Sequence, residues 1–229
     1  MSKQGSVKLT LLCNAGFAIE TDTAMLLLDA PNREVPPFAS VPEDIWKKIL
    51  KREPPFHKLC GFWFSHAHPD HCDLDRVAQY RALWPDTPVF VPTQAMLRGR
   101  GEMGSFRMEY RRFAHAPIEA LPPHVVTWID AGGFTIYASG DAALEPEAHR
   151  AFLRGRKADI AIWNPMYLSR PETRSLLAQT ADRNLICHLP NRREDSGGYW
   201  KKAEHNLTRY GDELTSVTIL SEPPVTMEL

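Results

Sequence analysis

The chain has 229 residues, of which 43% are hydrophobic and 24% are charged, and its formal net charge at pH 7 is −1. This is the composition of an ordinary globular protein, so we expect a single domain over residues 1–229. The balanced charge gives no overall electrostatic reason to bind nucleic acid or an anionic membrane.

The beginning of the chain has no apolar segment followed by a small-residue cleavage site, and no apolar run approaches the roughly 20 residues that cross a bilayer. The cysteines form no CxxC pair, which favours reduced thiols over disulfides or a zinc ribbon. We therefore expect a cytoplasmic protein that does not enter a membrane. The cysteines are Cys13, Cys60, Cys72 and Cys187.

Strands are predicted to open the chain. Residues 8–20 and 24–29 are apolar, β-compatible runs separated by a short polar turn, which predicts a hairpin. Residues 59–65 form a continuous apolar run without polar alternation, as expected for a strand buried on both faces. These runs together predict a sheet in the first part of the chain.

A proline-rich excursion, residues 31–58, lies between these predicted strands. Inside it, Ser40 and Glu43 have the spacing of a capping box, which predicts the start of one helix. We expect the excursion to form part of a pocket wall. The apolar candidates for that wall are Phe38, Trp46 and Phe56.

Helices and strands alternate through the rest of the chain. The sequence DAGG between residues 125–129 and 134–139 predicts a hairpin, and Ser169 with Glu172 predicts another capped helix start. This alternation favours an α/β protein with mixed sheets. The other predicted elements are helices over residues 74–83, 93–98, 144–154 and 199–209, and strands over residues 89–91, 108–113, 160–163, 185–187 and 214–220.

The stretch SHAHPDHCD, residues 65–73, holds three of the nine histidines of the chain. Imidazole and carboxylate groups are standard ligands for zinc, iron and manganese. His66 and His68, two residues apart at the end of a predicted strand, can face one ion. Because Pro69 bends the chain, Asp70 and His71 are presented in another direction, which suits a second ion.

Further candidate ligands follow other predicted strands. His115 comes after residues 108–113, Asp141 after residues 134–139, and His188 after residues 185–187. In layered α/β domains, residues just past the carboxyl ends of buried strands meet at one edge. The sequence therefore predicts a site at that edge with donors enough for two ions.

In this ordered set the chain resembles the metallo-β-lactamase superfamily of metal-dependent hydrolases. The resemblance extends over residues 8–190 and rests on five features of the sequence. These are the motif HAHPDH, the later His115, the tripeptide SGD ending at Asp141, the segment LICHLP around His188, and Asp29 after the first hairpin. It implies a four-layer αββα sandwich with two mixed β-sheets and a dinuclear metal centre. The expected ions are two divalent cations, with zinc first and manganese or iron as alternatives.

The resemblance also implies a role for each residue. His66, His68 and His115 would bind one metal, and Asp70, His71 and His188 the other. Asp141 would bridge the two ions and Asp29 would support the ligands from behind. The implied ligand and support residues are thus His66, His68, Asp70, His71, His115, Asp141, His188 and Asp29.

Some assignments stay open at this point. His124 also lies between the motif and Asp141, so it is the alternative to His115 as third histidine ligand. Arg192 and Arg193 follow His188 closely and could hold an anionic substrate by paired hydrogen bonds, or they could belong to a solvated loop. Cys72 and Cys187 adjoin proposed ligands but are expected to pack in the interior, and His57, His149 and His205 are interpreted as solvent-facing.

The implied activity is hydrolysis. A hydroxide formed between two metals would attack an ester-like bond, such as a phosphodiester, lactone or thioester, in a small anionic substrate, with Asp70 and Asp141 as the catalytic carboxylates. A nucleic-acid substrate is less favoured, because the chain has no long basic arm. The alternatives are an iron-dependent redox or dioxygen enzyme on the same fold and a non-catalytic metal-binding protein.

Overall fold

The computed structural model describes residues 6–115, 122–220 and 222–229. Within these residues, six strands form one sheet in the order β13-β1-β2-β3-β4-β5. β3, β4 and β5 run parallel, whereas β1, β2 and β13 pair antiparallel. Their bounds are β1 Lys8–Leu11, β2 Phe17–Glu20, β3 Met25–Leu28, β4 Leu59–Trp63, β5 Val89–Phe90 and β13 Val225–Glu228.

Seven strands of the described chain form the second sheet, in the order β12-β11-β10-β9-β8-β7-β6. β9 to β12 run parallel, and β6 to β9 are joined by antiparallel pairings, so this sheet is mixed as well. Their bounds are β6 Arg98–Met103, β7 Phe106–Phe113, β8 His124–Ala131, β9 Phe134–Ala138, β10 Ala158–Trp163, β11 Ala181–Ile186 and β12 Val217–Ile219.

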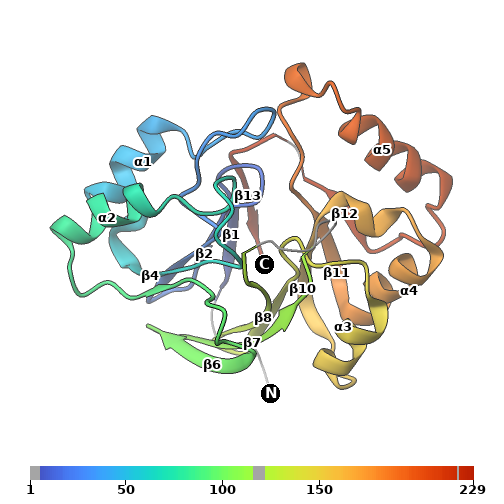
Figure 1. Ribbon diagram of the computed structural model, residues 1–229, viewed down its shortest axis with the longest axis horizontal. Coiled ribbons are helices and arrows are strands. Elements are labelled where there is room, and N and C mark those ends of the chain that lie inside the picture. Colours follow the sequence, from blue (N-terminus) through green and yellow to red (C-terminus); the bar gives the residue numbers. More distant parts are fainter. Residues whose placement is uncertain (1–5, 116–121, 221) are drawn as a thin grey trace.

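Helices cover the outer faces of both sheets. Figure 1 shows α1 and α2 on the side of the six-stranded sheet and α3, α4 and α5 on the side of the seven-stranded sheet. The predicted αββα layering is therefore confirmed. The helices are α1 Glu43–Leu50, α2 Leu74–Leu83, α3 Pro146–Leu153, α4 Pro171–Thr180 and α5 Tyr199–Arg209, and short 3₁₀ turns are η1 Phe56–Lys58, η2 Pro165–Leu168 and η3 Arg192–Glu194.

Three hydrophobic clusters separate the four layers. One lies between the sheets, one under α1 and α2, and one under α3, α4 and α5. Alternate residues of β7 illustrate the division, because Met108 faces the core between the sheets and Phe113 packs in the cluster under the helices. Both faces of the central strands are thus removed from water, as their apolar sequences predict.

A hydrogen bond crosses the interior from one sheet to the other. Trp63 of β4 donates from its indole Nε1 to Oγ1 of Thr127 in β8, at 3.0 Å. Both side chains are 1% exposed, and the Trp63 ring stacks on Phe90 with centroids 3.7 Å apart. The bond satisfies two buried polar groups at once and fixes the sheets in register.

Several local predictions are wrong. Residues 8–20 form two strands rather than one, because the chain reverses where the amide of Leu12 bonds to Gly16 O at 2.8 Å. Neither predicted capping box exists, since α1 starts after Pro42 and α4 after Arg170 without a side-chain cap. Prolines in and before the first turns set these starts instead.

Residues 93–98 do not form a helix, and this prediction is also wrong. The chain turns there and enters β6 at Arg98, which pairs with β7 through Met103. Gly99 and Gly101 disfavour a helix but fit a strand whose inner face lies against Tyr110 and Trp63. The strand β13 was not predicted, because its short polar-apolar alternation resembles an exposed tail.

No helix of the described residues is long and apolar enough to cross a membrane.

We expect Trp63→Phe to lower the free energy of unfolding by about 2 kcal/mol, because Thr127 loses its buried donor and a void remains. Equilibrium urea unfolding followed by circular dichroism measures the change. Adding Thr127→Val to Trp63→Phe removes the unpaired hydroxyl and should recover about 1 kcal/mol. Equal stability of Trp63→Phe and the parent would show that the bond contributes nothing.

Candidate metal centre

The histidine motif lies on a tight loop between β4 and α2. The amides of His71 and Cys72 both donate to the carbonyl of His68, at 3.0 and 2.8 Å. At the end of the loop, Asp73 caps α2 by accepting from the amides of Asp75 and Arg76. The loop is therefore fixed by its own turn and by the helix that follows it.

The segment after β3 holds the loop from the other side. The amide of Arg33 donates to Pro69 O at 2.7 Å, and the side chain of Asn32 donates to Asp70 O at 3.1 Å. Asn32 is fully buried and also bonds to Ala39 O. The start of the proline-rich excursion thus positions the motif.

Asp29 accepts hydrogen bonds from both ends of the motif. One carboxylate oxygen accepts from the Ser65 amide at 2.6 Å, and the other accepts from Ser65 Oγ at 2.8 Å and His71 Nδ1 at 3.1 Å. Asp29 is 4% exposed and has φ of 49°, so the chain bends sharply where β3 ends. The structure therefore places Asp29 behind the candidate ligands, as the resemblance implies.

These bonds decide which ring nitrogen of His66 and His71 carries the proton. Because Ser65 gives its hydroxyl hydrogen to Asp29, its oxygen accepts from His66 Nδ1 at 2.9 Å. His71 likewise donates from Nδ1 to Asp29. When each ring is neutral, its Nε2 then carries the lone pair, which is the form that binds a metal.

The first candidate group is His66, His68 and His115, whose ligand atoms lie within 4.8 Å of one another. His66 Nε2 is 3.0 Å from His68 Nδ1 and 3.2 Å from His115 Nε2. His115 follows β7 and pairs with Ala142 in an isolated bridge, which brings it beside the loop that carries Asp141.

The second candidate group is Asp70, His71 and His188. His188 Nε2 lies 3.2 Å from Asp70 Oδ2. His188 follows β11 with φ of 60°, and its amide donates to Asn14 O at 2.5 Å. This left-handed residue ends the strand and directs the imidazole toward the motif loop.

One oxygen of Asp141 lies between the two groups. Asp141 Oδ2 is 3.3 Å from His71 Nε2, 3.6 Å from His188 Nε2 and 3.8 Å from His115 Nε2. The preceding Gly140 has φ of 51°, and a Cβ there would lie 2.6 Å from His124 Nε2. Only glycine therefore lets the chain approach closely enough to place Asp141 here.

The donor set fits metal ions. Two ligands each about 2.1 Å from a tetrahedral ion are roughly 3.4 Å apart. The close pairs within the two groups, and the pair of His71 and Asp141, are separated by 3.0 to 3.3 Å. His71 Nε2 is buried and makes no hydrogen bond among the described residues. Facing lone pairs repel, so a cation among them would stabilise this arrangement.

Burial acts to lower the pKa of His71, but the carboxylates of Asp141 and Asp29 outweigh it and hold the pKa well above its usual range. Burial, followed by the charge of His71, holds the pKa of His66 well below its usual range, which keeps the ring neutral. Burial acts to raise the pKa of Asp141, but His188 and His71 outweigh it and hold the pKa well below the usual range. The centre thus combines a neutral imidazole with a firmly ionised carboxylate.

His124 lies next to the centre without joining either group. It is 1% exposed, and its ring centroid is 5.2 Å from that of His66. Neither ring nitrogen has a hydrogen-bond partner within the described part of the chain, and burial lowers its pKa to about 3. The geometry therefore favours His115 over His124 as the third histidine of the first group.

Of the aromatic residues expected in the pocket wall, Phe38 lies beside the candidate metal centre. Its ring centroid is 4.6 Å from that of His188 and 6.0 Å from that of Tyr199. Trp46 and Phe56 are 3% and 4% exposed and pack in the core under α1 and α2. Their predicted place in the wall is wrong, because the helix stripe that contains Trp46 faces the sheet.

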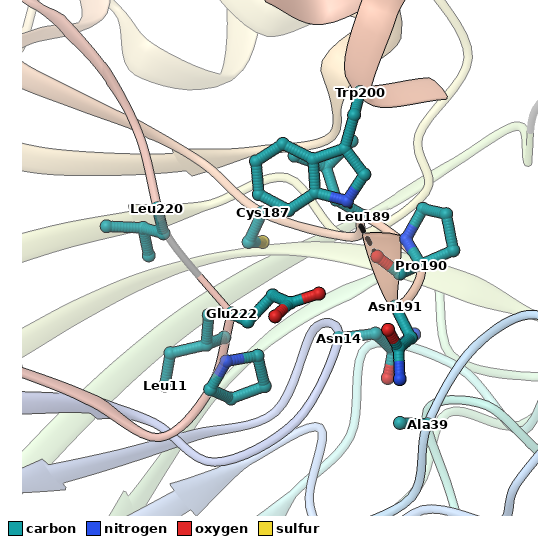
Figure 2. Close-up of a pocket in the computed structure, with 11 residues that line it drawn as sticks. Leu11, Asn14, Ala39, Cys187, Leu189, Pro190, Asn191, Trp200, Leu220 and Glu222 are labelled. Atoms are coloured by element: carbon teal, nitrogen blue, oxygen red, sulfur yellow. Dashed lines mark hydrogen bonds between the residues drawn. The ribbon is translucent and has the colours of Figure 1, made fainter. Parts of the chain in front are cut away.

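Arg192 does not present a free guanidinium. It donates to Glu204 at 2.7 Å and lies over the ring of Trp200, 3.8 Å from its centroid. Trp200 and Glu222, whose carboxylate accepts from the Arg192 amide, line a separate cavity of about 150 Å³ together with Cys187 (Figure 2). Arg193 is exposed, and its contact with substrate stays a prediction.

The cysteines beside the ligands are packed, as expected. Cys72 and Cys187 are each 5% exposed and lie in hydrophobic clusters. Burial raises the pKa of Cys72 to about 12 and that of Cys187 well above its usual range. Neutral thiols of this kind are poor ligands.

The interpretation of His149 as solvent-facing is wrong. It is fully buried and hydrogen-bonds to the hydroxyls of Tyr137 and, at 2.7 Å, Tyr167. Tyr167 in turn donates to Ala142 O and Ala143 O at 3.2 and 3.1 Å. This buried network supports the chain next to Asp141. Only the spacing of His149 with Phe152 and Leu153 on one helix face could have indicated it.

Sequence reasoning also missed Ser65, whose hydroxyl connects Asp29 to His66. Its place directly before the first histidine gave no chemical signal, because serine is common in turns and loops.

No protein-family model matches the chain, and no curated protein matches it. Solved structures do. YhfI of Bacillus subtilis, a metallo-β-lactamase fold protein, is similar with a TM-score of 0.64 and 16% identity, covering 98% of this chain and all of its own. The metallo hydrolase Igni18 of Ignicoccus hospitalis has a TM-score of 0.60 and 16% identity, with 98% of both chains covered.

CmlA, a diiron β-hydroxylase from Streptomyces venezuelae, is similar over the whole of this chain, with a TM-score of 0.63 and 9% identity. This chain corresponds to 54% of CmlA. At these identities the likeness concerns the fold. The chain has the metallo-β-lactamase fold, with two mixed sheets flanked by helices.

We expect Asp29→Asn to weaken metal binding by about 10- to 100-fold, because outer partners that orient ligands contribute that much. The amide can no longer accept from both Ser65 and His71 as a carboxylate does. Competition with a chromophoric chelator measures the affinity for zinc. The matched control is Asp22→Asn, at an exposed position, and affinities equal to the parent in both variants would contradict the role of Asp29.

Proposed function

We propose that this protein is a metal-dependent hydrolase that holds two divalent cations and cleaves an ester-like bond in a small anionic substrate. The observation that carries the proposal is the position of Asp141 Oδ2, which lies 3.3 to 3.8 Å from nitrogens of both candidate groups. A single carboxylate oxygen shared in this way suits a site for two ions. The metal-dependent hydrolases among the similar structures support the same activity.

His66, His68 and His115 would hold one cation, Asp70, His71 and His188 the other, with Asp141 shared. The predominance of imidazole favours zinc, with manganese and iron as alternatives. When bound, two such ions supply the Lewis acidity that makes water a nucleophile near pH 7 and stabilises charge on the reacting oxygen.

The residues of the chain then orient and confine the reaction. Asp70 is partly exposed, with 15% of its side chain accessible, and it bonds through Oδ2 to His188. We propose that Asp70 orients the attacking water. The hydrogen bonds that Asp29 accepts hold His71 and, through Ser65, His66 in their binding tautomers.

The surroundings of the centre support a substrate that enters from solvent. His188 and Asp141 keep 13% and 15% of their side chains accessible, so a substrate can reach them from solvent. Phe38 covers one side of His188 and offers an apolar surface to a substituent on either side of the bond that is cleaved. Phosphodiesters, lactones and thioesters fit this description, and we place phosphodiesters first for testing.

We expect hydrolysis of an aryl phosphodiester by protein reconstituted with zinc, manganese or iron, and none in chelated protein. Asp141→Asn should lower kcat by more than about 100-fold with the fold intact. Removing a metal ligand should lower activity more than removing a residue that only orients a ligand. His68→Ala should do the same, whereas its control His205→Ala, at an exposed position, should not.

Turnover in Asp141→Asn equal to the parent would contradict the bridging role. Two bound metals without turnover on diesters would move the proposal to lactones and thioesters. If those also fail and the iron-loaded protein consumes no oxygen, the protein is a non-catalytic metal-binding protein.

A second candidate is an iron-dependent oxygenase, and the likeness to the diiron β-hydroxylase CmlA favours it. The same imidazole and carboxylate ligands accept iron. Bound iron with oxygen consumption, and no hydrolysis by the zinc form, would replace the hydrolase by this activity.

We expect Phe38→Ala to raise KM for aryl substrates by several-fold, because it removes the apolar surface beside His188, while kcat changes less. Comparing aryl with methyl diesters measures the preference. Trp46→Phe is the control, since Trp46 is buried away from the centre. An unchanged preference for aryl substrates in Phe38→Ala would remove Phe38 from the substrate site.

A further inference from the structure

A groove of about 730 Å³ lies on the outer face of the seven-stranded sheet, next to its β6 edge. The side chains of β7 alternate, so that Met108 faces the core while Glu109 and Arg111 face outward. The end of α3 forms the opposite wall through Phe152 and Arg154.

The groove is strongly basic. Arg98, Arg100, Arg111 and Arg154 line it, all exposed, and none forms an ion pair with a residue that the structure describes. The carboxylate that lines it, Glu109, already bonds to Arg156 at 2.9 Å. The positive charge of the groove is therefore not neutralised from within the described chain.

The pairing of β6 with β7 makes this arrangement unfavourable for the free protein. Arg98 lies directly opposite Arg111 in the antiparallel ladder, and like charges at such positions repel. A bound anion would turn this repulsion into attraction. The guanidinium group suits phosphate oxygens in particular, since its planar donors match them in pairs.

We propose that this groove binds a compact oligophosphate at a site separate from the metal centre. Its volume falls within the range of roughly 300 to 1,000 Å³ that is usual for small-molecule pockets. The net charge of the whole chain is −1. That charge gives a long polyanion no general attraction beyond the groove.

The groove and the metal centre use different parts of the sheet. The candidate ligands follow strand ends, whereas Arg98, Arg100 and Arg111 project from the outer face of β6 and β7. Oligophosphate binding can therefore be lost without loss of the metal centre, and the reverse.

The test is titration of the metal-loaded protein with inorganic triphosphate, followed by calorimetry at low ionic strength. Arg98→Gln/Arg111→Gln should weaken binding by about tenfold or more, since each charge-assisted bond contributes on that order. The control is Arg107→Gln, because Arg107 is exposed on the same strand but does not line the groove. It should bind like the parent.

His68→Ala separates this site from the centre, and it should keep triphosphate binding while losing metal-dependent hydrolysis. Triphosphate that withdraws metal from the centre releases the same heat in the parent and in the arginine variants. The difference between their titration heats therefore measures binding in the groove. Unchanged binding in Arg98→Gln/Arg111→Gln, or no binding by the parent, overturns the proposal. A single-stranded oligonucleotide that binds through the same arginines more tightly than triphosphate would overturn the compact ligand in favour of nucleic acid.

Discussion

The carboxylate of Asp29 is the interaction on which the metal centre depends. It is buried at the end of β3, and accepts hydrogen bonds from Ser65 and His71 on the neighbouring loop. A buried charge is stable only when fully hydrogen-bonded. The same bonds therefore stabilise the carboxylate, join two parallel strands of the sheet, and set the protonation of the candidate ligands. Fold and site share one set of contacts.

The parallel strands explain why the ligands meet. Asp29, His66, Asp141 and His188 follow β3, β4, β9 and β11, and in each sheet these strands have parallel neighbours. Backbones at such strand ends no longer need to continue a ladder, so they can adopt left-handed conformations, as Asp29, Gly140 and His188 do. The local strain is accepted where the sheets already hold the chain.

Strong local patterns predicted an α/β protein with mixed sheets and a cluster of candidate ligands, and the family resemblance implied the four layers. Continuous apolar runs indicated buried strands, and HAHPDH concentrates donors in six positions. Sequence reasoning failed where the deciding contact is distant. His149 looked polar but bonds to Tyr137 and Tyr167, and residues 93–98 looked helical but lead into β6, which pairs with β7. The role of Ser65 was not predicted, because it depends on a hydrogen bond to a carboxylate 36 residues away in the sequence.

The last strand has a consequence for how the chain folds. β13 pairs with β1, so Lys8 lies opposite Glu228 and the six-stranded sheet joins segments from opposite ends of the sequence. Closing so large a loop is slow and entropically unfavourable, so this pairing should form late, after the apolar strands have assembled. Until then the edge of β1 is open to pairing with another chain. During synthesis, the edge of the six-stranded sheet therefore stays uncovered until residues 225–228 have been made.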